Sequence, residues 1–200
     1  MLYACRQIID RARWEWREMR RPSRPSFVQE ELDRALLDEI DWPRGQRVLD
    51  IGCGDGAYLR ALAGRGALVV GVDLNPEALR SARAAGHQVL RASGLSLPFA
   101  EGAFDTILCH RTLYLFDRPD SAVREFHRIL RRGGRVVFSG SNTASPYARF
   151  QALAIEADRR GKWAFGNRLS FPDWCRRFTA AGFRTERIYS CNLVWPIVFR

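Results

Sequence analysis

The sequence contains almost no lysine, no paired cysteines and no long run of apolar residues. Lysine supplies only Lys162 among the 32 basic residues, a ratio that we attribute to the codon usage of a GC-rich genome. The five cysteines are odd in number and form no Cys-x-x-Cys pair, so we expect neither a disulfide framework nor a metal site. No apolar run approaches the roughly 18 residues needed to cross a bilayer.

The first residues do not resemble a signal peptide, because charged residues follow Leu2–Ala4 at once. Unpaired cysteines fit a reducing compartment, so we expect a cytoplasmic protein. A length of 200 residues with 46% hydrophobic residues is sufficient for one domain with a sizeable core.

The net charge of +10 is confined to the two flanks of the chain. Residues 1–25 carry seven arginines against three acids, and residues 149–200 carry ten basic residues against four acids. Residues 26–148 hold fifteen charges of each sign and are neutral. Basic flanks of this kind suit an anionic substrate, an acidic membrane surface or nucleic acid.

Strand and helix patterns alternate through the middle of the chain. We expect strands at 47–51, 67–73, 87–92, 104–110 and 135–140, separated by helices at 57–63, 75–85 and 119–130. Asn75-Pro76 supplies a helix cap followed by a proline in the first turn, and Gly133-Gly134 is predicted to end the third helix. Strands separated by helices imply parallel crossovers and a doubly wound α/β sheet.

The segment before this core is predicted to be helical, and the segment after it is predicted to contain both helices and strands. Amphipathic helices are expected at 2–19 and 26–40, and further helices at 145–160 and 170–182. Two strands, 183–191 and 193–199, would close the sheet as an antiparallel hairpin, with Pro196 requiring a bulge or an exposed edge. The predicted fold is a Rossmann-like, doubly wound, mostly parallel seven-stranded sheet. We divide it into an N-terminal helical lid (1–45), a core (46–141) and an insertion with closing strands (142–200).

The segment LDIGCGDGAY at 49–58 is a strand, a tight glycine loop and a helix start. Its glycines are spaced GxGxG, whereas a dinucleotide fold would show GxGxxG with a pyrophosphate at the helix N-terminus. Asp50 lies just before the loop, where a carboxylate would repel a pyrophosphate but attract the ammonium group of a methionine moiety. Asp73 ends the second strand and can accept hydrogen bonds from both ribose hydroxyls. Together, these features favour S-adenosylmethionine over NAD.

Four motifs carry a family resemblance: VLDIGCGDG (48–56), VVGVDLNPEAL (69–79), LPFAEGAFD (97–105) and REFHRILRRGGRVV (124–137). On these motifs, residues 48–140 resemble the class I methyltransferases of the ubiquinone and menaquinone biosynthesis type. The resemblance implies that Asp50 and the glycines hold methionine, Asp73 holds ribose, Leu74 packs on adenine, and the segment before LPF lines the adenine. The cofactor-binding residues we expect are Asp50, Gly52, Cys53, Gly54, Tyr58, Asp73, Leu74, Ser93, Gly94, Leu95, Cys109 and His110.

The chain departs from many relatives at two positions. Ser93 stands where they have an acid that binds the adenine amine, and a hydroxyl accepts that hydrogen bond more weakly. Leu115 stands where they have a histidine after the fourth strand. His110 lies five residues earlier, at the carboxyl end of that strand.

His110, Arg111 and Tyr114 are the candidate catalytic residues, because the methyl group should face the acceptor at this position. His110 could act as a general base, or it could shape the pocket without exchanging a proton. Many methyl transfers need only positioning and desolvation of the acceptor. His87 and His127 lie away from the expected site and are interpreted as structural.

Aromatic and basic residues of the flanks are candidates for the acceptor pocket, because the resemblance implies that flanking helices cover the cofactor. The candidates are Trp16, Tyr147, Trp163 and Arg168. They suggest a small-molecule acceptor with an apolar or aromatic body and a negative group. The arginine- and tryptophan-rich helix at 2–19 could also lie on an anionic membrane surface, at the inner face of the membrane.

The leading hypothesis is methyl transfer from S-adenosylmethionine to O, N or C of a small or lipid-like molecule. A nucleic-acid methyltransferase is an alternative prompted by the basic flanks, but no DPPY- or NPPY-type motif and no Pro-Cys dipeptide supports it. A non-catalytic partner subunit that keeps the cofactor fold is a third hypothesis, prompted by Ser93 and Leu115. The sequence does not determine an oligomeric state.

Overall fold

The computed structural model describes residues 36–38, 40–141, 169, 171–188 and 194–199. The first strand, β1 (Arg47–Ile51), is followed by α3 (Ala57–Gly64), β2 (Leu68–Asp73), α4 (Pro76–Ala84) and β3 (Val89–Arg91). Next come β4 (Phe104–His110), a 3-10 turn η1 (Leu113–Leu115), α5 (Pro119–Ile129) and β5 (Leu130–Ser141). The chain ends with α7 (Phe171–Ala180), β6 (Thr185–Ile188) and β7 (Val194–Phe199).

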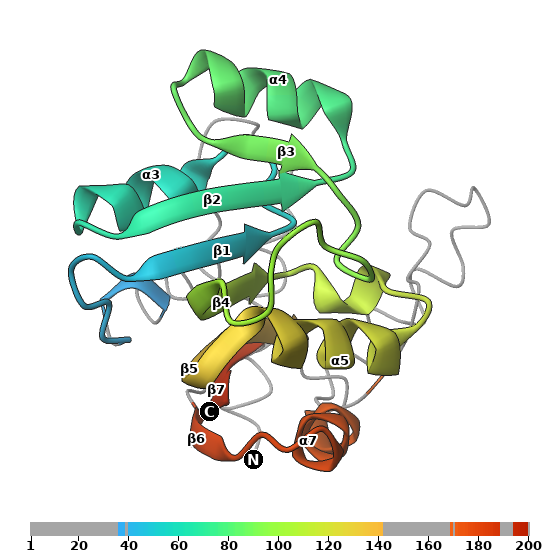
Figure 1. Ribbon diagram of the computed structural model, residues 1–200. Coiled ribbons are helices and arrows are strands. Elements are labelled where there is room, and N and C mark those ends of the chain that lie inside the picture. The colour runs from blue at the N-terminus through green and yellow to red at the C-terminus, as the bar shows by residue number, and fades with distance from the viewer. Residues whose placement is uncertain (1–35, 39, 142–168, 170, 189–193, 200) are drawn as a thin grey trace, which may run out of the picture.

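The strands form one sheet in the order β3-β2-β1-β4-β5-β7-β6. β3, β2, β1, β4 and β5 run parallel to their neighbours, whereas β7 pairs antiparallel with both β5 and β6. Figure 1 shows β1 and β4 in the middle of the sheet, with α4 and α7 at opposite ends of the molecule. The predicted doubly wound, mostly parallel α/β fold is confirmed.

Alternate residues of the central strands build two separate cores, because successive side chains of a strand point to opposite faces. Leu49, Ile107 and Val136 face a core that includes Phe126 of α5 and Phe178 of α7. The residues next to them in sequence, Val48, Leu108 and Val137, face the other core. That core also contains Leu62 of α3 together with Leu36, Ile40 and Trp42. Both faces of the sheet are therefore covered, which fits the near-continuous apolar character of these strands.

The turn after the third predicted helix differs from expectation. Gly133-Gly134 do not end this helix, because α5 stops at Ile129 and β5 begins at Leu130. The register between β4 and β5 shifts after the Phe104–Leu130 pair, and Gly133 adopts a φ of 72° in the shifted stretch. The glycines thus permit an irregularity inside a strand rather than a helix end.

The remaining observations concern the third strand, a 3-10 turn and Pro196. The strand expected at 87–92 is limited to Val89–Arg91, and the 3-10 turn Leu113–Leu115 was not predicted. β7 lies between β5 and β6, but its printed pairing with β6 covers only Ile197–Phe199, so the exposed edge expected at Pro196 stays a prediction. Pro196 lies opposite Ser139 without a break in the register of β5 and β7.

The predicted N-terminal lid lies almost wholly outside the described residues, as do the helix expected at 145–160 and the turn between β6 and β7. Leu36 and Ile40, which lie within the stretch 26–40 expected as an amphipathic helix, are 0% and 4% exposed. Within the part of the chain that the structure describes, no helix is long and apolar enough to span a membrane.

An ion pair in α5 fastens the loop that carries the LPF motif. The Glu125 carboxylate accepts hydrogen bonds from the Leu97 amide at 2.7 Å and from Arg128 at 2.7 Å. Arg128 also donates to the carbonyls of Leu97 and Phe99, at 3.1 and 2.8 Å. Two residues of one helix turn thereby satisfy three backbone groups of the loop.

We predict that Glu125→Gln lowers the free energy of unfolding by about 1–2 kcal/mol at pH 7, a value discounted because Arg128 is partly exposed. Hydrogen bonding from Arg128 lowers the pKa of Glu125 below 4.5, so this stabilisation should be present above that pH and lost as the solution is acidified. Urea unfolding at pH 7 and pH 4 measures it. Glu186→Gln, at an exposed position, is the control. An equal loss of unfolding free energy in both variants would show that the contacts of Glu125 with Arg128 and the loop do not stabilise the fold.

Candidate active site

The predicted glycine loop lies at the carboxyl end of β1, where a doubly wound sheet binds ligands. The amides of Gly52 and Cys53 both donate to the carbonyl of Val72, at 2.8 and 3.1 Å, which fastens the loop to β2. Gly52 and Gly54 have φ values of 80° and 54°, a region that favours glycine. A Cβ on Gly52 would lie 2.1 Å from the Thr112 hydroxyl, whereas one on Gly54 would meet nothing within 4 Å. The loop therefore packs against the turn after β4 on one side and leaves space at its tip.

Asp50 is the buried acid of this site, at 2% exposure. Among the residues that the structure describes, its side chain has neither a hydrogen bond nor an ion pair. Burial, and secondarily the nearby carboxylate of Asp73, raise the pKa of Asp50 from 3.8 to about 7. A carboxylate in this environment is poorly stabilised and has a strong preference for a cationic partner.

Asp73 ends β2 and is held by backbone amides on both oxygens. Gly54 N–H donates to Oδ2 at 2.9 Å, and Asn75 N–H donates to Oδ1 at 2.8 Å. The Asn75 side chain in turn caps α4 by accepting from the amides of Glu77 and Ala78, as its sequence position predicted. The carboxylate of Asp73 is thus fixed between the glycine loop and the start of α4, with lone pairs left for further donors.

The segment before the LPF motif lies beside the end of β2. Ser93 and Ser96 form an isolated bridge, and the Leu95 amide donates to Ser93 Oγ at 3.2 Å. A Cβ on Gly94 would lie 2.6 Å from the Phe116 ring, so the backbone is held close to the core there. Leu74 is 59% exposed at the adjoining strand end, an unusual exposure for a large apolar side chain.

Several polar residues at the end of β4 are linked by hydrogen bonds. His110 Nε2 lies 3.3 Å from the Tyr58 hydroxyl, and His110 Nδ1 lies 2.9 Å from the Ser139 hydroxyl. Arg111 has a φ of 52°, and its amide donates to Ser139 Oγ at 3.0 Å. Burial, together with the nearby charge of Arg111, lowers the pKa of His110 to about 3. His110 is therefore neutral at physiological pH.

The comparisons with known proteins agree with this geometry. The methyltransferase domain family matches residues 49–138. A ubiquinone biosynthesis O-methyltransferase of Thiobacillus denitrificans is 31% identical over 158 residues, which cover 72% of this chain and 67% of that protein. The chain belongs to the class I S-adenosylmethionine-dependent methyltransferases. The resemblance stated from the four motifs is thus confirmed.

Two further comparisons show how much of a relative's length this chain covers and which fold it shares. A ubiquinone biosynthesis O-methyltransferase of Pseudomonas aeruginosa is 35% identical over 131 residues, 60% of this chain and 55% of that protein. The chain therefore spans little more than half the length of that relative. A methyltransferase structure from Methanosarcina mazei shares the fold, with a TM-score of 0.67, 21% identity, and coverage of 78% of this chain and 92% of that chain.

The residues present fit S-adenosylmethionine, the cofactor of this family. The molecule carries an ammonium group, which matches the buried Asp50 carboxylate that has no cation beside it among the described residues. Its ribose hydroxyls are donors, which match the fixed carboxylate of Asp73. The space at the tip of the loop, at Gly54, admits a ligand close to the backbone.

The structure brings together most, not all, of the residues predicted for the methyltransferase site. Cys53 and Cys109 are buried, and burial raises the pKa of the Cys53 thiol to about 12, so neither is a nucleophile. Tyr114 is half-buried in η1, and Leu115 beside it is 55% exposed. Four acceptor-pocket candidates lie outside the described residues: Trp16, Tyr147, Trp163 and Arg168.

Two polar residues of the site were missed by sequence reasoning. Ser139 is 0% exposed in β5 and contacts His110, and Thr112 contacts Gly52 and donates to the His110 carbonyl at 2.9 Å. A hydroxyl inside the apolar run RVVFSG was the available signal for Ser139. Thr112 carried no such signal, because it follows the strand among other polar residues.

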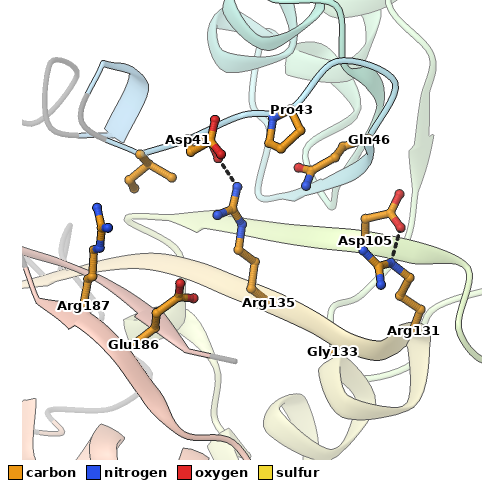
Figure 2. Close-up of a pocket in the computed structure, with 10 residues that line it drawn as sticks. Asp41, Pro43, Gln46, Asp105, Arg131, Gly133, Arg135, Glu186 and Arg187 are labelled. Carbon is orange, nitrogen blue, oxygen red and sulfur yellow. Dashed lines mark hydrogen bonds and ion pairs between the residues drawn. The ribbon is translucent and has the colours of Figure 1, made fainter.

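A separate hollow of about 230 Å³ opens at the other edge of the sheet, where the parallel strands begin. Figure 2 shows Arg131 directed at Asp105 and Arg135 directed at the backbone carbonyl of Asp41. Asp105 forms ion pairs with Arg131 and Arg47 at the amino ends of β1 and β4. We interpret the hollow as a structural ion network and not as the methyltransferase site.

We predict that Gly54→Ala weakens binding of S-adenosylmethionine at least about 10-fold with a stability cost near 1 kcal/mol, because the added Cβ enters ligand space and not protein atoms. Gly86→Ala is the matched control, since Gly86 also has a positive φ (85°) and no atom within 4 Å of the added Cβ. Calorimetry and thermal unfolding measure both properties. Equal affinities in the two variants would refute the placement of the ligand.

We predict that Asp50→Asn stabilises the ligand-free protein while it abolishes cofactor binding. A pKa raised to about 7 means that the folded state loses stability as the pH rises from about 4 to 7. Removing the charge should raise the free energy of unfolding by about 2–4 kcal/mol at pH 8 and by less at pH 5.

Asp105→Asn is the control of opposite sign. Burial raises the pKa of Asp105, but hydrogen bonds from Arg47 and Arg131 outweigh burial and lower it overall. This variant should lose stability at pH 8. Urea unfolding of both variants decides the point, and destabilisation by Asp50→Asn at pH 8 would show that Asp50 has a stabilising partner.

Proposed function

We propose that the protein transfers the methyl group of S-adenosylmethionine to an oxygen of a small, lipid-like acceptor. The observation that carries the proposal is the buried carboxylate of Asp50, which has no cationic partner among the described residues and lies below a glycine loop with space at its tip. Asp50 would pair with the ammonium group of the cofactor. The loop glycines would allow the methionine moiety to lie against the backbone.

The other expected cofactor residues take complementary roles in this proposal. The Asp73 carboxylate, fixed by the amides of Gly54 and Asn75, would accept from the ribose hydroxyls. The exposed Leu74 would cover one face of the adenine, and Ser93, Gly94 and Leu95 would line its edge. Burial of an exposed leucine by a ligand would also explain why this side chain is left uncovered by protein.

The reaction requires little acid–base chemistry from the protein. S-adenosylmethionine supplies a sulfonium methyl group that is already electrophilic, so the protein has to align the acceptor and exclude water. His110 ends β4, and Arg111 and Tyr114 follow it in the chain; in this proposal they would face the reacting groups. A pKa of about 3 makes His110 a weak proton acceptor at neutral pH, which favours the shaping role considered for it over general-base catalysis.

The proposed acceptor is an aromatic or lipid-like alcohol or phenol. The relatives from Thiobacillus denitrificans and Pseudomonas aeruginosa are named O-methyltransferases of ubiquinone biosynthesis, which supports oxygen as the acceptor atom. Leu115, 55% exposed beside Tyr114, offers an apolar surface where many relatives have a histidine. Contact with a membrane surface through residues 2–19, which their arginine and tryptophan content would allow, would suit an acceptor of low solubility.

We predict that the protein methylates an alkyl-substituted catechol in an assay with tritiated S-adenosylmethionine, and that an aliphatic amine and an RNA transcript receive no label. Asp73→Ala should abolish transfer and weaken cofactor binding, because the ribose contact is lost. Label on RNA would favour the nucleic-acid alternative. Cofactor binding without transfer to the catechol or the amine would favour the non-catalytic partner subunit.

A further inference from the structure

One short turn after β4 contacts both segments that are expected to hold the cofactor. The Thr112 side chain fills the space beside Gly52 of the glycine loop, where an added Cβ would lie 2.1 Å from Oγ1 and 2.6 Å from Cγ2. The Phe116 ring does the same at Gly94, in the segment before the LPF motif, at 2.6 Å from Cζ and 2.9 Å from Cε1. Residues 112–116, which we call the bridging turn, therefore touch one cofactor segment at each end.

The bridging turn is held by hydrogen bonds within itself and to β4. The Thr112 hydroxyl donates to the carbonyl of His110 at 2.9 Å. The Leu115 amide donates to the Thr112 carbonyl at 2.9 Å, and the Phe116 amide donates to the Leu113 carbonyl at 3.3 Å. These two consecutive bonds, each spanning three residues, fix the spacing between Thr112 and Phe116.

The bridging turn has an inner side in the core and an outer side that is left uncovered. Leu113 is 2% exposed and Phe116 is 9% exposed, and the Phe116 ring packs edge-on against Phe126 of α5, with centroids 6.3 Å apart. Leu115, next to the half-buried Tyr114, is 55% exposed. The turn thus presents Tyr114 and Leu115 from a base that the core holds in place.

The contact with Phe116 accounts for the glycine at position 94. The φ of Gly94 is not in the left-handed region, so its backbone does not itself require glycine. An added Cβ would also lie 3.1 Å from Cγ2 of Ile51, but the Phe116 ring is nearer. Gly52 differs, because its φ of 80° favours glycine in addition to the close approach of Thr112.

We infer that Thr112 and Phe116 are positioning residues, which hold the outer side of the bridging turn in register with the two cofactor segments. This inference rests on the proposed function and deepens it. It takes Tyr114 and Leu115 to face the acceptor, and it takes the glycine loop and residues 93–95 to hold the cofactor. The bridging turn would then align the donor with the acceptor.

Alignment matters in this reaction because the transfer proceeds in line. An acceptor oxygen forms a bond to the methyl carbon while the bond from that carbon to sulfur breaks. The electron pair of the broken bond stays on sulfur, and the acceptor proton passes to solvent. A displacement of about 1 Å can cost on the order of 100-fold in rate.

Loss of the two contacts should affect this alignment more than cofactor affinity. The glycine loop is also fastened to β2, through the amides of Gly52 and Cys53. The loop that carries the LPF motif is fastened to α5 by Glu125 and Arg128. Each cofactor segment therefore has a second attachment that does not involve the bridging turn.

A double-mutant cycle on the cofactor-free full chain tests the contact between Phe116 and Gly94. Gly94→Ala should lower the urea midpoint by about 0.5–1 M, because its Cβ would overlap the ring. In a Phe116→Leu background, which removes the overlapping ring atoms, the same change should cost less than about half as much. Gly64→Ala is the control, since its Cβ would meet nothing within 4 Å. Additive losses would refute the contact.

Steady-state kinetics with an alkyl-substituted catechol, together with calorimetry on S-adenosylhomocysteine, tests the positioning role. We expect Thr112→Ala to lower kcat at least about 10-fold while the Kd of S-adenosylhomocysteine changes less than about 3-fold. Thr112→Ser keeps the hydroxyl nearest Gly52 and should recover most of the rate.

Phe116→Leu should lower kcat in the same way. Its matched control is Phe183→Leu, which also shortens a buried ring, 4% exposed and packed against His127, and which should leave kcat unchanged. Equal losses of kcat in these two variants would overturn the positioning role. So would a Thr112→Ala variant that loses affinity as much as it loses kcat.

Methyl NMR of leucine-labelled protein tests the bridging turn without an acceptor. Saturation with S-adenosylhomocysteine should shift the Leu115 signals in the unchanged protein and shift them less than about half as far in Thr112→Ala. Leu68, 63% exposed at the start of β2, is the reference and should not shift. Equal Leu115 shifts in the two proteins, or none in the unchanged protein, would overturn the inference.

The outcomes separate this inference from the proposed function. If S-adenosylhomocysteine does not bind the unchanged protein, the proposed function fails and the positioning role fails with it. If it binds but the catechol is not methylated, the proposed acceptor is wrong, and the Leu115 shifts decide the role of the bridging turn. If binding and transfer are normal in every variant, the proposed function stands and the positioning role is refuted.

Discussion

The burial of Asp50 with no cation beside it among the described residues is the constraint on which the rest of the site depends. Its carboxylate lies one residue before the end of β1, between β2 and β4 in the sheet; it is 2% exposed, and its pKa is raised to about 7. A folded protein that retains such a group accepts a loss of stability at neutral pH, which is common where the group is needed for a ligand. The glycine loop that follows it has space at its tip, since an added Cβ on Gly54 would meet no atom within 4 Å.

The remaining polar residues of the site are held by the fold itself. The amides of Gly54 and Asn75 fix Asp73, and the amide of Arg111 fixes Ser139. The bonds Gly54–Asp73 and Arg111–Ser139 join neighbouring strand ends at the carboxyl edge of the sheet, and the bond Asn75–Asp73 is local to one turn. Donors and acceptors are thus oriented before any ligand binds, which reduces the entropy lost on binding.

Much of this arrangement could be predicted from the sequence, because local signals and the global fold agree. The strands Arg47–Ile51 and Phe104–His110 were predicted to the residue, since their apolar runs are bounded by polar residues and glycines. Asp50 and Asp73 were recognised as candidate cofactor-binding residues because of their positions near the ends of the first two strands. The Asn75 cap followed from the proline after it.

Other features depend on contacts that a single sequence does not reveal. Gly133 has the signature of a helix end, but it permits a shifted register between β4 and β5. Ser139 belongs to the site only because it forms hydrogen bonds with the His110 ring and the Arg111 amide. These residues are 29 and 28 positions away in the chain. The left-handed backbone of Arg111 likewise has no local signature in the sequence, and its amide donates to a residue of the next strand, Ser139.

The most direct measurement of the central claim is the number of protons released when S-adenosylhomocysteine binds at pH 6, obtained by calorimetry in buffers of different ionisation enthalpy. With a pKa of about 7, Asp50 is mostly protonated at pH 6 in the free protein, and pairing with an ammonium group requires the carboxylate form. We expect release of nearly one proton per ligand at pH 6 and little at pH 8. Binding at pH 6 without proton release would contradict it.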